Sequence, residues 1–320
     1  MEHLRGDDPV RIGPYTVLGR FDSVSSSPSS AAPGPRYIAR SADGDRTVLI
    51  FLPCAGADSS RWVAEARHAC ALPLPGFLPV DEVGGEPTAP WCAAPYVAAL
   101  PLPDVLVAHG GPLPEPFVRA VGAVLASSLR AAHARGVIHA GLSPSAVLVT
   151  PGGIRLSGFG TVRSAGVDGE HRGSVPGLDH ASLPPEQMTG GRPRPLGDVY
   201  GIGAVLSYAS TGHTVPEREE LPEGLRAVIT ACLARDPAQR PEAAALEAEF
   251  AARAGRPVAD TDASRAMSGP QATVLDAPFA AALPPRVAVA LARTAAAVLA
   301  AEPPAQLMET HSSRVTGTLD

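Results

Sequence analysis

The chain has 320 residues, a net charge of −6 and only 4% aromatic residues, and all 26 of its basic side chains are arginine. The absence of lysine excludes a Walker A phosphate-binding loop and a Schiff-base enzyme, because both depend on an ε-amino group. The negative charge argues against binding to nucleic acid or to an anionic membrane surface. The length exceeds that of one hydrophobic core and favours at least two lobes.

The first third of the chain predicts short strands and one helix. Residues 59–71 predict the helix, with Ser59 or Ser60 as its N-cap. A stretch rich in Ser, Ala and Pro at 21–35 predicts a loop. The β-rich runs that predict the strands are 15–18, 36–40 and 47–52.

The middle of the chain becomes mostly helical. Apolar residues recur at helical spacing over 116–134 and predict a long helix there. Short strand-like pieces follow at 137–138, 146–149 and 154–156. The later helices are expected at 198–209, 223–234 and 241–253.

Beyond residue 253 the composition turns polar and predicts a linker. One Ala-rich helix follows, and we expect it to dock on the large lobe because an isolated helix of this kind is marginal in water. The predicted divisions are an N-terminal tail at 1–12, lobes at 13–98 and 99–252, the linker at 253–280, the helix at 281–302 and a disordered tail at 303–320.

The sequence gives no sign of membrane insertion. The N-terminus lacks the apolar core of a signal peptide. The longest apolar stretch, 286–301, is mostly alanine and is too short and too weakly hydrophobic to span a bilayer. We therefore expect a cytoplasmic protein.

Seven segments follow one another in the order and spacing of a protein kinase. They are RIGPYTVLGR, RTVLIFL, GVIHAGLSPSAVLV, IRLSGFG, SLPPEQM, GDVYGIGAVLSYASTG and CLARDPAQRP. Over about residues 11–252 the chain resembles the bacterial Hanks-type Ser/Thr protein kinases of actinobacteria. The resemblance implies an α+β fold of two lobes, a small β-rich N-lobe and a larger helical C-lobe.

The residues that such a kinase uses for phosphoryl transfer are replaced. Phe51 stands where the family has the lysine that holds ATP, and Gly141 stands where it has the aspartate that orients the substrate hydroxyl. Ser143 replaces a phosphate-contacting lysine, Ala146 replaces a magnesium-binding asparagine, and Gly158 replaces the main metal-binding aspartate. Neither metal position keeps a hard oxygen side chain for Mg²⁺.

The phosphate-covering loop and the adenine site also depart from the family pattern. Only Gly19 remains of the glycine-rich loop, and Asp22 in that loop would repel phosphate. Leu49 replaces the alanine that makes room for adenine. The resemblance therefore implies that neither ATP nor Mg²⁺ binds, and we expect no cofactor.

The positions that support the fold are retained. The resemblance pairs Glu186 with Arg240 and makes Asp198 a hydrogen-bond acceptor for the catalytic-loop backbone. His139 and Phe159 match members of the hydrophobic spine. Glu65 matches the helix acid that normally pairs with the missing lysine, so we expect it to be either exposed or paired with an arginine.

These observations predict a pseudokinase, a signalling scaffold or regulatory module that binds a protein, such as a kinase or a phosphothreonine-binding protein. One alternative is a Ser/Thr kinase or kinase-fold transferase with relocated, weak ATP-dependent activity. Another is an adaptor regulated by phosphorylation of Thr273, which lies in a Thr-x-x-Asp pattern. We interpret the adjacent Asp179 and His180 as a solvated loop pair.

Overall fold

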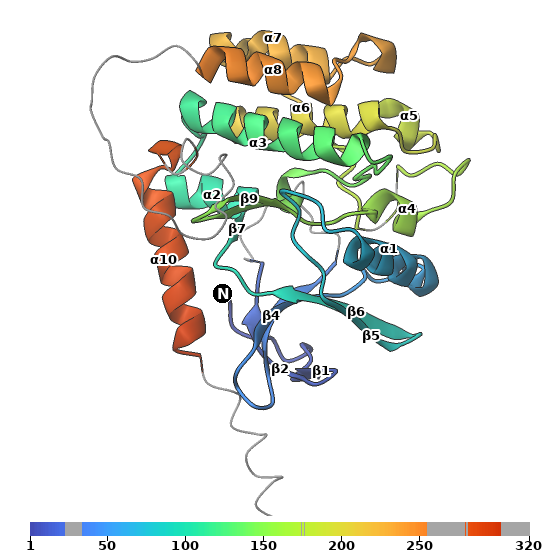
Figure 1. Cartoon of the computed structure of the whole chain (residues 1–320), viewed down its shortest axis with the longest axis vertical. Helices are drawn as coiled ribbons and strands as arrows, with labels where there is room; N and C mark the ends of the chain where they lie inside the picture. Colours follow the sequence, from blue (N-terminus) through green and yellow to red (C-terminus); the bar gives the residue numbers. More distant parts are fainter. Residues whose placement is uncertain (23–33, 174, 176, 255–278, 280, 302–320) are drawn as a thin grey trace, which may run out of the picture.

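The computed structural model describes residues 1–22, 34–173, 175, 177–254, 279 and 281–301. A β-rich small lobe lies against a larger helical lobe, and residues 96–99 join the two (Figure 1). This architecture confirms the expected two-lobed α+β fold. Most of the predicted loop at 21–35, most of the linker at 253–280 and all of the tail at 303–320 lie outside the described residues.

The small lobe is built on an antiparallel six-stranded sheet in the order β1-β2-β3-β4-β6-β5. Helix α1 (Ser59–Ala71) packs against β5 and β6. Asp58 caps this helix by accepting a hydrogen bond from the amide of Arg61, so the prediction of Ser59 or Ser60 as the cap is wrong. The strands are β1 (Arg11–Ile12), β2 (Tyr15–Arg20), β3 (Arg36–Ser41), β4 (Thr47–Phe51), β5 (Glu82–Glu86) and β6 (Ala89–Pro95).

The predicted N-terminal tail, residues 1–12, belongs to this sheet. Strand β1 pairs with β2, and the backbones of Glu2 and Arg20 exchange hydrogen bonds of 3.0 and 2.9 Å. Ile12 is buried in the same apolar cluster as Tyr15 and Trp91. Burial of Ile12 gives this segment a reason to join the lobe rather than to extend as a tail.

The side chains of β4 alternate between two faces of the sheet. Val48 and Ile50 belong to the apolar cluster on one face, while Leu49 and Phe51 pack on the cluster of the opposite face, which faces the large lobe. Arg36 of β3 lies directly opposite Phe51 in the strand register. Both side chains therefore project from the sheet on the side of the interlobe cleft.

The large lobe is organised around helix α3, which packs against α6 and α8. Residues 137–138, predicted as a strand, have no regular structure and lead into the loop between α3 and β8. The small sheet has the order β7-β8-β9, with β7 at Leu100–Pro101, β8 at Val147–Thr150 and β9 at Gly153–Leu156. The helices are α2 (Leu102–His109), α3 (Glu115–His133), α4 (Thr161–Ala165), α5 (Pro185–Met188), α6 (Pro195–Thr211), α7 (Glu223–Cys232) and α8 (Ala243–Ala254).

Helix α10 (Pro285–Leu299) docks back on the domain beside α2 (Figure 1). Docking on the large lobe was predicted from the Ala-rich sequence, and α10 also reaches the small lobe. Within the described residues, no helix has the length and apolar character needed to cross a bilayer.

Candidate functional site

The loop at 137–146 forms the floor of the interlobe cleft, and Asp198 of α6 holds its backbone. The Asp198 carboxylate accepts hydrogen bonds from the amides of His139 (2.8 Å) and Ala140 (2.9 Å) and also contacts Nε2 of His133 (2.9 Å). Ala140 has a φ of 52°, a left-handed conformation that costs energy in a residue with a Cβ. The expected contact of Asp198 with this loop is present, and it stabilises the strained residue.

Gly141, where the resemblance to kinases leads one to expect an aspartate, has no space around its α-carbon. A Cβ built there would lie 2.6 Å from the carbonyl oxygen of Gly158 and 2.8 Å from Cβ of Thr161. The Thr161 hydroxyl donates a 2.6 Å hydrogen bond to that same carbonyl. The loop and the turn after β9 therefore pack together, and only glycine fits between them.

Ser143 and Ala146 are buried, and Ser143 lines a small cavity together with Gly141 and Thr161. The Ser143 hydroxyl lies 3.1 Å from the hydroxyl of Ser145, and Ala146 is fully buried. The carbonyl of Ala146 accepts hydrogen bonds from the amide (2.8 Å) and the hydroxyl (3.0 Å) of Ser157. The Ser143 hydroxyl and the Ala146 carbonyl are thus both hydrogen-bonded within the chain.

Phe159 follows Gly158 and joins an aromatic cluster. Its ring packs edge-on against Phe77, His68 and His139. His139 is fully buried, and its Nε2 lies 3.0 Å from the carbonyl oxygen of Ser157. Burial lowers the pKa of His139 to about 4, so this ring is neutral at physiological pH. The contacts expected of His139 and Phe159 as parts of a hydrophobic spine are present.

Glu65 of α1 pairs with Arg163 of α4. The guanidinium donates to both carboxylate oxygens, at 2.8 and 2.6 Å. The same guanidinium lies 4.9 Å from the centre of the Phe159 ring. Of the two outcomes expected for Glu65, the structure has the arginine partner rather than exposure. The carboxylate of Glu65, which the resemblance would pair with a lysine, is thereby paired with α4, the helix that follows Gly158.

Arg36 occupies the cleft near Phe51 and crosses to the floor. Its side chain pairs with both carboxylate oxygens of Asp22, and Nη1 donates a 2.9 Å hydrogen bond to the carbonyl of Ser145. The residue is only 3% exposed. This interaction ties the loop that would cover the phosphates of a nucleotide to the floor beneath it.

An apolar cluster fills the part of the cleft beside the joining segment. Leu49 and Leu148 are fully buried, and Phe21 is 5% exposed in the same cluster. The Phe21 ring lies 5.1 Å from the Arg36 guanidinium. Leu49, which was expected to crowd the adenine position, therefore packs within a continuous apolar contact between the lobes.

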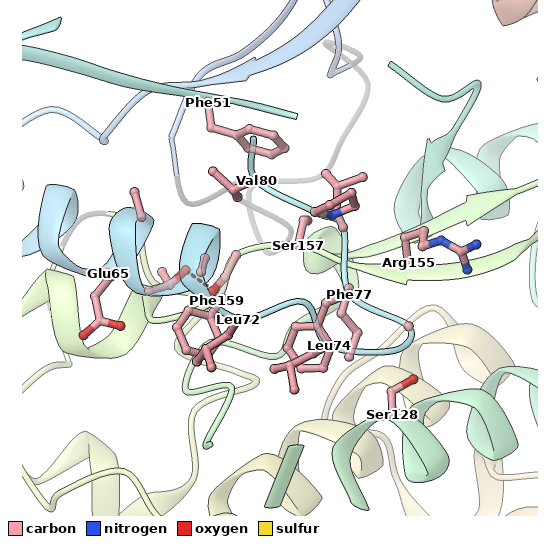
Figure 2. A pocket seen from close by; sticks show the side chains of 18 of the residues that line it. Phe51, Glu65, Leu72, Leu74, Phe77, Val80, Ser128, Arg155, Ser157 and Phe159 are labelled. Atoms are coloured by element: carbon pink, nitrogen blue, oxygen red, sulfur yellow. Dashed lines mark hydrogen bonds between the residues drawn. The ribbon is translucent and has the colours of Figure 1, made fainter. Parts of the chain in front are cut away.

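A cavity of about 630 Å³ lies deeper, between α1, the 72–80 loop, α3 and β9 (Figure 2). Phe51 and Val80 form its upper wall, and Phe159 and Phe77 lie below them (Figure 2). Leu49 and Leu148 do not line it, whereas Phe51 and Gly158, two of the positions replaced relative to the kinase pattern, do. Its lining is mainly apolar but includes Arg36, Arg130 and Arg155.

Comparison with known proteins identifies the scaffold. No family model matches the chain. The kinase domain of Mycobacterium tuberculosis PknI superposes with a TM-score of 0.58 at 21% identity, over 76% of this chain and 96% of that domain. The chain has the protein-kinase fold.

Sequence relatives are serine/threonine protein kinases of actinobacteria. AfsK of Streptomyces coelicolor is 32% identical over 275 residues, which cover 78% of this chain and 33% of AfsK. The probable kinase PkwA of Thermomonospora curvata is 31% identical over 274 residues, which cover 78% of this chain and 35% of PkwA. The chain thus spans about a third of the length of these relatives.

In this kinase fold the expected pair between Glu186 and Arg240 is present. Nη1 and Nη2 of Arg240 donate to the two carboxylate oxygens of Glu186, at 2.7 and 2.8 Å. Arg240 also donates to the carbonyls of Leu196 and Ala234 and lies over the ring of Tyr200. A buried guanidinium with these partners anchors the segment before α6 to the loop before α8.

The interpretation of Asp179 and His180 as a solvated pair is wrong. The Asp179 carboxylate accepts from the Ser182 hydroxyl (2.8 Å) and lines a small cavity with Gly141 and Thr161. Burial raises the pKa of the Asp179 carboxyl. Nε2 of His180 is buried without a hydrogen-bond partner in the described structure. The segment folds back over the loop at 137–146, which the polar sequence did not indicate.

Three arginines organise the kinase fold in ways that the sequence analysis missed. Arg36 and Arg163 were not singled out because their acidic partners lie 14 and 98 residues away. Arg172 is fully buried and donates to the carbonyls of Gln187 (3.0 Å) and Gly191 (2.9 Å). Neither an arginine beside a β-rich run nor an acidic residue in a predicted helix has a neighbouring sequence pattern that identifies its partner so far along the chain.

Proposed function

We propose that this chain is a catalytically inactive member of the kinase fold that serves as a protein-binding scaffold or regulatory module. The observation that carries the proposal is the packing of Gly141 against Gly158 and Thr161. A carboxylate cannot occupy that position without displacing the turn after β9. Phosphoryl transfer in this fold relies on that carboxylate to orient the attacking hydroxyl.

The charge distribution in the cleft supports the same proposal. Phe51 offers no cation for the phosphates, and Ala146 and Gly158 offer no side-chain oxygen for Mg²⁺. The nearby guanidinium of Arg36 is already paired with Asp22 and Ser145. Binding of a nucleoside triphosphate would require Arg36 to separate from Asp22. The Asp22 carboxylate would then lie beside the phosphates without its partner.

Two measurements on the purified chain test the proposal. Mg-ATP at saturating concentration is expected to leave the melting temperature unchanged, whereas a ligand at 1,000 times its Kd would add about 4 kcal/mol to the stability of the folded state. Incubation with γ-³²P-ATP is expected to label neither the chain nor a generic acceptor such as myelin basic protein. Labelling that depends on Mg²⁺ would overturn the proposal.

A second candidate is a weak Ser/Thr kinase with relocated residues. Its support is the similarity to AfsK and PkwA together with the place of Arg36, which faces the cleft from the strand next to Phe51. This candidate predicts radiolabel transfer that disappears in Arg36→Ala. The scaffold proposal predicts no transfer in either protein.

The proposed partner is a protein, and the proposed location is the cytoplasm. Recovery of partners from native cells with the tagged full chain would identify them. Thr273 lies outside the described residues, so its role as a phosphoacceptor stays a prediction from the sequence. Phosphopeptide mapping of the native protein tests it, since an unmodified Thr273 would exclude the phosphorylated adaptor.

A further inference from the structure

Helix α10 lies across the boundary between the two lobes. It begins beside α2 of the large lobe and ends beside the small-lobe sheet, running past the joining segment at 96–99 (Figure 1). Fifteen helical residues rise about 22 Å, which is enough to reach from one lobe to the other. The helix therefore has two attachment sites, one on each lobe.

The first attachment site is the core of the large lobe. Val287 is fully buried there and Leu291 is 2% exposed, both in the cluster that contains α2 and α3 residues. Just before the helix, Phe279 is 1% exposed, and its ring centre lies 5.3 Å from that of Phe117. Arg286 adds a 3.2 Å hydrogen bond to the carbonyl of His109. The N-terminal half of α10 is thus part of the large-lobe core.

The second attachment site is on the small lobe. Val298 is 2% exposed and belongs to the apolar cluster in which Leu18 and Leu49 of the small lobe meet Leu148 of the large lobe. Arg40 of β3 donates from Nη2 to the carbonyl of Val298 (2.9 Å) and from Nη1 to the carbonyl of Ala301 (3.1 Å). The last carbonyls of a helix lack partners within it and carry partial negative charge, so an arginine there is favourable.

A stiff element attached at both ends limits the motion of the bodies that it joins. The lobes are also connected by the short segment at 96–99 and by contacts across the cleft, including that of Arg36 with the carbonyl of Ser145 and the ion pair of Glu65 with Arg163. Rotation of the small lobe away from the large lobe would separate Val298 from Leu18 and Leu49 and break both hydrogen bonds of Arg40. Opening of the cleft therefore requires the free energy of at least one of the two α10 attachment sites.

We infer that α10 is a clasp that fixes the angle between the lobes, and that release of its C-terminal turn lets them open. The inference goes beyond the proposed function, because it holds whether or not the chain transfers phosphate. The residues that carry it are Val298 and Arg40 on the small-lobe side and Val287 and Leu291 on the large-lobe side.

The test measures the distance between the lobes by double electron–electron resonance on the full chain. Spin labels are attached at two exposed positions, Ala42→Cys in the β3–β4 turn and Glu219→Cys on the large lobe, after the more accessible native thiols Cys54 and Cys70 are replaced by serine. The clasp predicts a single narrow distance in this parent. Hydrogen exchange of the large-lobe helices verifies that each variant remains folded.

Val298→Asp is expected to broaden the distance distribution at least about twofold and to shift it to longer values, because a charged side chain cannot stay in the apolar site. Arg40→Ala should broaden it less, since the apolar contact remains. Val289→Asp is the matched control, because this residue on the same helix is 50% exposed, and it should leave the distribution unchanged.

Two results would overturn the clasp. One is an unchanged distribution in Val298→Asp while faster amide exchange shows that the end of α10 has detached. The other is equal broadening in Val289→Asp, which would make the effect one of general destabilisation. If Val298→Asp unfolds the chain, Arg40→Ala decides alone, and an unchanged distribution in it rejects the inference.

Discussion

Glu65 and Arg163 form a two-point ion pair that links helix α1 to the segment after Gly158. Arg163 also donates a 3.0 Å hydrogen bond to the carbonyl of Ile138, so the same side chain reaches the loop at the floor of the cleft. Gly160 lies so close that a Cβ there would be 2.2 Å from a carboxylate oxygen of Glu65. One arginine therefore joins helix α1, helix α4 and the loop at the floor of the cleft.

Replacement of Arg163 by alanine should lower the free energy of unfolding by about 2 kcal/mol, because it leaves Glu65 without its partner in a half-buried place. Arg163→Lys should recover only part of this, since an ammonium cannot contact both oxygens as a guanidinium does. Urea unfolding followed by circular dichroism measures both. Arg67→Ala, at an exposed site on α1, is the control. A loss no greater than that of the control would contradict the structural role of the pair.

Restoring the family aspartate at Gly141 should damage the fold rather than create activity. The new side chain would collide with the Gly158 carbonyl and with Thr161, and overpacking of this kind costs about 1–3 kcal/mol. Thermal unfolding should show the loss, with no added stabilisation by Mg-ATP. Gly152→Asp is the matched control, because a Cβ at Gly152 meets nothing within 4 Å. A Gly141→Asp protein as stable as that control would show that the loop has room for a carboxylate.

The sequence predicted the scaffold well because its signals are local or depend on order along the chain. The β-rich runs at 15–18, 36–40 and 47–52 predicted strands that the structure contains, and helical periodicity over 116–134 predicted α3. The pair between Glu186 and Arg240 was also predictable, because both lie in motifs with a fixed place in the fold. These features need no knowledge of how distant segments meet.

The cleft was less predictable because its contents come from segments far apart. The substitution at Phe51 was visible, but the contact of Arg36 with Ser145 spans 109 residues and has no local pattern. The burial of Asp179 depends on the path of the segment between α4 and α5, which a polar loop sequence does not specify. The resemblance predicted which positions of the cleft differ from the kinase pattern, and the structure shows which side chains lie there.

Stability should fall as the pH is lowered from about 6.5 to about 4, because of His139. Its folded pKa of about 4 is below the ordinary value of 6.5, so in this range the unfolded chain binds a proton that the folded chain does not. The stability that comes from keeping His139 neutral is fully present above pH 6.5. Its complete loss, once the pH has fallen to about 4, lowers the free energy of unfolding by about 3 kcal/mol. Burial dominates the shift; Arg163 and His133 act in the same direction, and Asp198 opposes it.

His139→Phe tests this pH dependence. Phenylalanine can keep the aromatic contacts with Phe77 and Phe159 but cannot take up a proton. Its free energy of unfolding, measured in urea at several pH values, should change much less between pH 6.5 and pH 4 than that of the parent. Identical slopes in the two proteins would show that other groups, and not His139, control acid stability.

Arg36→Ala should be among the most destabilising changes in the small lobe. The residue is 3% exposed, and its loss leaves Asp22 and the carbonyl of Ser145 without their donor. Removal of one member of a buried ion pair lowers the free energy of unfolding by about 3–5 kcal/mol. Because Asp22 is partly exposed, we expect a loss of about 3 kcal/mol. Arg46→Ala is the control, because Arg46 pairs with Asp81 where both side chains are more than 40% exposed, and its loss should stay below about 1 kcal/mol. Equal losses in urea unfolding would mean that the Arg36 contact does not hold the cleft closed.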